Sequence, residues 1–119
     1  IILGNTSTRY SELRPLIDER DVELYDHFTS TFGGGLSGAP LRNDSLLACS
    51  TAVEALKELD PSHEFHVIRC GGLATADDIL ASRLIGVRLN QWYVGYFEAF
   101  GKVGHNVYGD VVSRMRDKR

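Results

Sequence analysis

The chain has 119 residues, of which 43% are hydrophobic and 24% are charged, and its formal net charge is −3. These values are typical of one globular domain with a modest core. No stripe of lysine and arginine runs through the sequence, which argues against nucleic acid as a partner. No apolar run reaches about 18 residues, so the sequence predicts no membrane-spanning helix.

The cysteines and histidines offer little sign of a metal site or a disulfide. Cys49 and Cys70 are the only cysteines, and their spacing matches no ligand motif. They favour a reducing compartment without a disulfide framework. His63 and His66 are the one histidine pair at a ligand-like spacing, but they flank a predicted strand, and we expect them in solvent.

The first part of the chain alternates between apolar and polar segments. Residues 1–3 form a short apolar run followed by small polar residues, which is typical of a buried strand in an α/β protein. A chain that opens inside such a strand is expected to be a piece of something longer. Residues 9–26 are mixed and charged, and Pro15 interrupts the weak helical pattern there. Residues 27–41 are predicted to form a polar, glycine-rich loop.

The sequence Gly-Gly-Gly-Leu-Ser-Gly-Ala-Pro-Leu, residues 33–41, is the densest glycine run of the chain. Glycine permits positive φ and close approach of the backbone to a ligand, so such a run marks a turn or a ligand-binding loop. A flexible linker is the alternative. Because Pro40 and Leu41 lead directly into a periodic segment, the run is predicted to introduce a helix.

The clearest helix is predicted over residues 43–59, where apolar side chains recur at spacings of three and four. Asn43 or Asp44 can cap its start, and Asp60-Pro61 ends it. Its apolar stripe consists of Leu46, Cys49, Val53, Leu56 and Leu59.

A second strand is predicted from Phe65 to Cys70, followed by a turn at Gly71–Gly72. Thr75 and Asp78 have the spacing of a capping box, so a helix is expected from there to about Leu84.

Gly86 is expected to end that helix, and residues 87–93 form the third predicted strand. Gly95 is interpreted as another turn. A terminal helix is predicted from about Val107, because apolar residues recur there every four positions. Basic residues at its end complement the helix dipole. They are Arg114, Arg116, Lys118 and Arg119.

Strands that alternate with helices predict an α/β fold of parallel βαβ units with right-handed crossovers. Three parallel strands leave both sheet edges open, and parallel sheets are normally covered on both faces. We therefore expect that this chain is not stable alone and needs the rest of a barrel or a partner chain.

Small residues follow each predicted strand, at 4–6, 71–72 and 93–95. The carboxyl ends of parallel strands meet at one edge, which is the active face of an α/β barrel. The last two loops, with the start of the helix at Thr75, are predicted to hold a phosphate dianion through backbone N–H groups. Ordinary βα turns are the alternative.

The order of these motifs resembles the C-terminal third of dihydroorotate dehydrogenase, in its membrane-associated, quinone-using class. That pattern runs Asn-Thr, then Gly-Gly-Leu-Ser-Gly-x-Pro-Leu, then Gly-Gly with an aspartate behind it, then a Gln-x-Tyr-x-Gly segment. The counterparts here begin at Asn5, Gly34, Gly71 and Gln91. The resemblance covers most of the chain and is most specific at the glycine run. It implies the last three βα units of a (β/α)₈ barrel, which cannot be complete in fewer than roughly 200 residues.

The resemblance also implies an activity and a set of site residues. The family oxidises dihydroorotate to orotate in pyrimidine biosynthesis, passing a hydride to FMN and electrons to quinone at the inner mitochondrial membrane. By analogy, Asn5 and Thr6 bind the substrate, and Ser37 and Gly38 lie along the flavin. The residues implied for the FMN phosphate are Gly71, Gly72, Tyr93, Val94 and Gly95.

The chain departs from the family pattern at several positions. Gly4 replaces a threonine that touches the flavin, Arg69 replaces a glycine, Val94 replaces a threonine, and Gly101-Lys102 replaces Gly-Pro. Arg69 is interpreted either as an anion ligand or as a side chain that fills the flavin's place. Residues 9–32 are longer and more charged than the family's loop.

The family's catalytic serine, its flavin-contacting lysine and its quinone-tunnel helices have no counterpart among these residues. The chain is therefore not expected to be competent alone, and no catalytic residue is assigned. Three interpretations stay open: part of a working FMN dehydrogenase, a non-catalytic structural subunit of a larger mitochondrial assembly, or a phosphate-binding βα module without redox chemistry.

Overall fold

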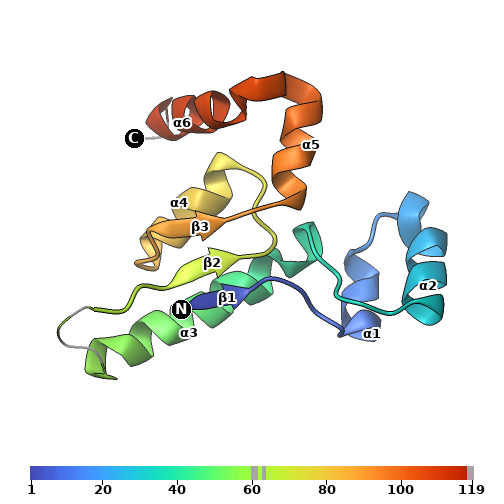
Figure 1. Ribbon diagram of the computed structural model, residues 1–119, viewed down its shortest axis with the longest axis horizontal. Coiled ribbons are helices and arrows are strands. Elements are labelled where there is room, and N and C mark those ends of the chain that lie inside the picture. The colour runs from blue at the N-terminus through green and yellow to red at the C-terminus, as the bar shows by residue number, and fades with distance from the viewer. Residues whose placement is uncertain (60–61, 63, 118–119) are drawn as a thin grey trace.

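The computed structural model describes residues 1–59, 62 and 64–117. Within them, three short parallel strands form an open sheet in the order β1 (Ile2–Gly4), β2 (Ile68–Cys70) and β3 (Leu89–Gln91) (Figure 1). The predicted α/β class with parallel strands is confirmed. The described residues do not close the sheet into a barrel.

Helices fill the connections between the strands. The long helix α3 (Arg42–Leu59) returns the chain from β1 to β2, and α4 (Ala76–Leu84) returns it from β2 to β3. The remaining helices are α1 (Tyr10–Leu13), α2 (Val22–Thr31), α5 (Val94–Val103) and α6 (Val107–Asp117). In Figure 1, α1 and α2 project beyond the ends of the strands, on the opposite side from α6.

The sheet is covered on one face. Leu3, Arg69 and Asn90 stand at paired positions, so their side chains share the face toward α3 and α4. Cys49 of α3 packs there with Val67 and Val87 in the centre of the core. Sequential parallel strands with right-handed crossovers place their helices on the same face, which accounts for this one-sided packing.

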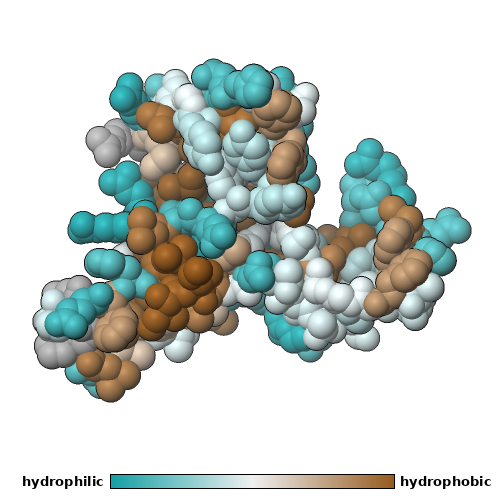
Figure 2. All heavy atoms as spheres, viewed as in Figure 1, coloured by the Kyte–Doolittle hydropathy of each residue, from teal (hydrophilic) through white to brown (hydrophobic). Residues whose placement is uncertain are grey.

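The opposite face of the sheet is bare. Ile2 and Leu89 are 57% and 48% exposed there. Figure 2 shows the resulting apolar patch where β1 and β2 face the viewer. A parallel sheet with one uncovered apolar face and two open edges is incomplete by the usual packing rules.

Local signals in the sequence correctly located several helices. The predicted helix over 43–59 is α3, which begins one residue earlier. The capping box at α4 is confirmed, because Thr75 accepts a hydrogen bond from the Asp78 backbone while the Asp78 carboxylate accepts from the Thr75 backbone at 2.9 Å. The terminal helix from Val107 is also confirmed. The predicted helix stop at Asp60-Pro61, His63 and the last two basic residues lie outside the described residues.

Other predictions were wrong. The predicted loop from residue 27 contains the second half of α2. Thr29, Ser30 and Thr31 are weak helix formers, so local propensity indicated a loop there. Gly95 is not a turn but lies in the first turn of α5, a helix that was not predicted. A Cβ at Gly95 would overlap the backbone of Leu73, so this glycine marks close packing rather than a reversal. The second and third strands are also shorter than predicted.

A glycine substitution tests the junction of β1 and β2. Gly4 has φ +100°, and a Cβ there would overlap the carbonyl oxygen of Cys70. We expect Gly4→Ala to lower the free energy of unfolding by about 3 kcal/mol. The control is Gly101→Ala in α5, where the added Cβ meets open space and should stabilise the protein by about 0.5 kcal/mol. Urea unfolding followed by circular dichroism measures both stabilities. Equal stabilities of the two variants would show that a side chain at position 4 does not overlap the Cys70 carbonyl.

Candidate functional site

The carboxyl ends of the three strands surround one hollow of about 210 Å³. All nine residues that the sequence nominated for substrate or cofactor binding line it, although they span about ninety positions of the chain. The structure adds Cys70, Leu73 and Trp92 to the lining, which sequence reasoning missed. The nine are Asn5, Thr6, Ser37, Gly38, Gly71, Gly72, Tyr93, Val94 and Gly95.

Backbone conformation at the end of β1 positions Asn5. Gly4 and Asn5 both have positive φ, at +100° and +72°, so the chain turns sharply at the edge of the sheet. The backbone N–H of Asn5 donates to the Cys70 carbonyl at 2.9 Å, and the side-chain oxygen of Asn5 lies 3.7 Å from the Cys70 sulfur. The turn therefore holds an amide and a thiol together at the hollow, while Gly4 contributes no side chain to it.

The glycine run is an ordered loop between α2 and α3. Its backbone pairs with the segment after β1 through two hydrogen bonds between Ser7 and Leu36, of 3.0 and 2.8 Å. The Tyr10 hydroxyl donates to the Gly34 carbonyl. Gly38 then faces Val94 across the hollow, with 3.6 Å between the position of a Cβ and the valine methyl. The run introduces a helix as predicted and does not separate two domains.

The start of α4 is poorly suited to the predicted dianion. The Asp78 carboxylate is 6% exposed and accepts hydrogen bonds from the backbones of Ala74 and Thr75 at 3.0 and 2.9 Å. It also pairs with Arg42 at 2.8 Å. A negative charge thus already occupies this helix terminus, and a second anion would be repelled.

The start of α5 is open. Its N-cap residue, Tyr93, makes no side-chain capping bond, and Val94 and Gly95 in its first turn line the hollow. Free backbone N–H groups and the positive end of the helix dipole favour an anion at such a place. Of the two loops predicted to hold phosphate, the one after β3 therefore offers the better donors.

Arg69 lies behind the hollow and does not enter it. Its side chain is fully buried between the sheet and the helices. Its guanidinium donates to Ser45 Oγ at 2.9 Å, to Ser82 Oγ at 3.0 Å, and to the carbonyls of Arg42 and Asp78 at 2.8 and 3.0 Å. Burial lowers its pKa, an effect that the nearby Asp78 opposes.

Both sequence interpretations of Arg69 were therefore wrong, because strand register directs this side chain to the helix face. It neither fills the flavin's place nor offers donors to an anion in the hollow. Its partner Ser45 donates to the Gly71 carbonyl at 2.7 Å, so the cluster supports the glycine loop from behind. Ser45 and Ser82 were missed, although a serine on the buried face of a helix is a signal of a buried polar partner.

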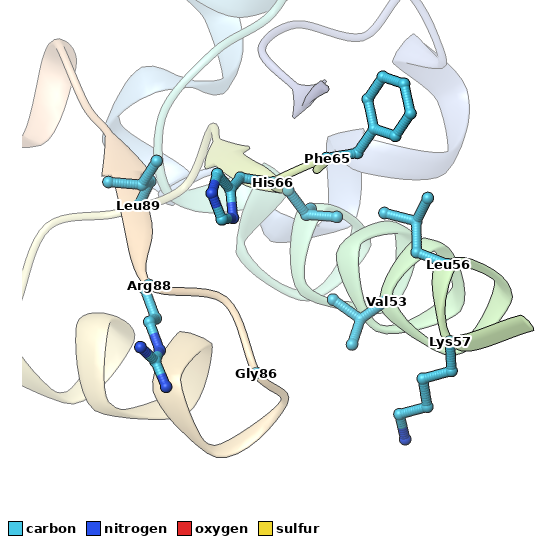
Figure 3. A pocket seen from close by; sticks show the side chains of 9 residues that line it. Val53, Leu56, Lys57, Phe65, His66, Gly86, Arg88 and Leu89 are labelled. Carbon is cyan, nitrogen blue, oxygen red and sulfur yellow. The ribbon is translucent and has the colours of Figure 1, made fainter. Parts of the chain in front are cut away.

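A larger hollow of about 450 Å³ lies at the other end of the sheet, between α3 and the segments that lead into β2 and β3 (Figure 3). Val53, Leu56 and Phe65 line it, and Lys57 and Arg88 extend from its margin. It lies at the amino ends of the strands, whereas parallel α/β sheets bind ligands beyond the carboxyl ends of their strands. We therefore place the candidate site at the smaller hollow.

Metal binding has no support among the described residues, where no group of three or more histidine, cysteine or acidic side chains gathers. No helix in the described ranges is long and apolar enough to cross a membrane. Comparison with protein-family models, curated proteins and solved structures finds no match to this chain.

The two cysteines should differ sharply in reactivity. Cys49 is fully buried in the core, whereas Cys70 is partly exposed at the hollow. In the native protein we expect Ellman's reagent to modify Cys70 at least roughly tenfold faster than Cys49. Cys70→Ser should remove the fast reaction, and Cys49→Ser should leave it. A fast phase that survives in Cys70→Ser would show that Cys49 is accessible and would contradict its burial.

Burial also raises the pKa of the Cys49 thiol, an effect that Arg69 partly opposes. Because the folded protein disfavours the thiolate, this thiol's contribution to stability is present below its unfolded pKa of about 8.5 and is lost as the pH rises above it. Urea midpoints measured across that range should fall less in Cys49→Ala than in the unsubstituted protein. Parallel curves would contradict this assignment.

Proposed function

We propose that this chain is the C-terminal part of a dihydroorotate dehydrogenase-like (β/α)₈ barrel flavoprotein. In that role it takes part in the oxidation of dihydroorotate to orotate, with FMN as hydride acceptor and quinone as electron acceptor. The observation that carries the proposal is the convergence of the motif residues at one hollow on the carboxyl edge of the sheet. Pyrimidine biosynthesis at the inner mitochondrial membrane is the corresponding setting.

The topology supports a barrel. Consecutive strands are neighbours in the sheet, and both crossover helices pack on the same face. Doubly wound sheets reverse their strand order and carry helices on both faces, whereas barrels do not. The bare apolar face and the two open edges are the surfaces that further barrel strands would cover. The proposed partner is therefore the remainder of the barrel, in the same or another chain.

The residues present fit one end of FMN. The uncapped start of α5 at Tyr93, Val94 and Gly95 suits the phosphate, with the Gly71–Gly72 loop beside it. Ser37 and Gly38 form the wall along which the flavin would lie. The hollow is smaller than the roughly 300–1,000 Å³ of complete ligand sites, so the remaining walls must come from elsewhere.

The substrate would lie toward Asn5 and Thr6, on the far side of the flavin from the phosphate. When bound, FMN supplies the hydride acceptor, while this chain's residues bind and orient. The side-chain amide of Asn5, held at the edge by its backbone bond to Cys70, suits hydrogen bonding to a dihydropyrimidine ring. The general base at the substrate carbon is expected from the remainder of the barrel.

A second candidate is a non-catalytic structural subunit of a larger mitochondrial assembly. Gly4 favours the structural subunit, because the Cys70 carbonyl leaves no room for a side chain at this position, where the family has a threonine against the flavin. Val94 likewise offers no hydroxyl group. In this interpretation, the open sheet edges and the bare apolar face serve assembly, and the hollow stays empty.

Flavin content separates these candidates. We expect the protein purified with its neighbouring chains to show FMN absorbance that dihydroorotate bleaches under anaerobic conditions. A colourless but intact assembly would instead support the structural subunit. Binding of inorganic phosphate without FMN would support a phosphate-binding module without redox chemistry.

A charge substitution at α5 tests the phosphate position. Val94→Glu places a carboxylate at the first position of the helix, which suits the helix dipole but repels a phosphate in the hollow. We expect FMN affinity, measured by fluorescence titration, to fall roughly tenfold or more. The control is Leu84→Glu on α4, where the native side chain is 88% exposed and does not line the hollow. Unchanged FMN affinity in Val94→Glu would place the phosphate elsewhere.

A further inference from the structure

The acidic lobe, residues 9–32, lies between β1 and the glycine run and is not used by the proposed site. It contains three arginines and six aspartates or glutamates, so it accounts for a net charge equal to that of the whole chain. Figure 1 shows its helices α1 and α2 projecting from the body of the molecule. The acidic lobe therefore offers a negatively charged surface outside the proposed site.

The lobe is internally ordered. Tyr25 of α2 is 9% exposed, and its hydroxyl donates to the Tyr10 carbonyl at 2.8 Å. Arg14 pairs with both oxygens of Asp26 at 2.8 and 2.7 Å. These contacts attach α2 to the segment of α1 and fix the orientation of α2.

Beside the residues that anchor it, α2 carries the apolar stripe Leu24, Phe28 and Phe32, spaced four residues apart. The three side chains are 58%, 52% and 69% exposed. The two phenylalanine rings lie 5.5 Å apart, and His27 packs edge-on against both. The stripe is thus a preformed aromatic cluster in solvent, of the kind that marks protein interfaces.

Acidic side chains border the first turn of the same helix. Glu19, Asp21 and Glu23 make no side-chain hydrogen bond or ion pair in the described part of the chain. Arg20 is held by Asp18 at 2.9 Å and does not neutralise all of them. The apolar stripe therefore has a negatively charged end.

We propose that the apolar stripe of α2 is a docking surface for a basic amphipathic helix of another protein. An apolar ridge would cover Leu24, Phe28 and Phe32, while lysine or arginine at one end would face Glu19, Asp21 and Glu23. A membrane surface is disfavoured, because helices that lie on anionic lipid carry basic polar faces. A second copy paired through the same stripe is disfavoured because its lobe has no unpaired basic side chain for the acidic end: Arg9, Arg14 and Arg20 each pair with a carboxylate of their own lobe. The proposal is independent of flavin binding.

The test uses a fluorescent helical peptide of leucine and lysine at helical spacing, titrated against the purified protein and followed by anisotropy. We expect saturable binding that weakens with added salt. Phe28→Ser with Phe32→Ser should weaken it roughly tenfold or more, and Asp21→Lys with Glu23→Lys roughly threefold or more at low salt. Leu84→Ser, at an exposed leucine of α4, should change nothing.

Circular dichroism of each variant establishes that the lobe remains helical, which is expected because the substituted side chains are exposed. A matched peptide with glutamate in place of lysine should not bind. Equal peptide affinity in the double phenylalanine variant would overturn the proposal. So would binding of the protein to phosphatidylserine vesicles that depends on the same phenylalanines, or self-association that they abolish.

Discussion

The buried guanidinium of Arg69 is the interaction on which the arrangement of the site depends. A cation removed from water is tolerated only when its donors are satisfied. Here two serines and two backbone carbonyls, from α3 and α4 and their starts, satisfy it. Because Ser45 also donates to Gly71, the same cluster joins both helices to the loop that forms the hollow. Arg69, which departs from the family pattern in the sequence, thus stabilises the glycine loop that forms the hollow.

The one-sided packing of the sheet and the position of the hollow have the same cause. Right-handed crossovers between neighbouring strands place α3 and α4 on one face and bring all strand ends to one edge. The same topology leaves the opposite face without a cover. The hollow at the edge and the bare apolar face are therefore consequences of one arrangement, and a partner that covers the face would also complete the walls of the hollow.

Elements with strong local signals could be predicted, and others could not. The spacing in α3 and the capping box of α4 depend on residues close in sequence, and both were found. The helix α2 was missed because Thr29, Ser30 and Thr31 in its second half are weak helix formers, although the apolar residues Leu24, Phe28 and Phe32 recur every four positions. The helix α5 was missed because Gly95 reads as a turn, whereas it is required by contact with the backbone of Leu73.

For the site, the sequence by itself determined which residues follow each strand, and parallel strands necessarily bring those residues to a common edge. Only the tertiary structure decided how that edge is built. The strand register directs the Arg69 side chain toward the helices. The Asp78 carboxylate occupies the start of α4, whereas the start of α5 has no capping side chain. The Cys70 carbonyl lies so close to Gly4 that no side chain fits there. These outcomes depend on contacts between segments far apart in the chain, which local periodicity and spacing do not encode.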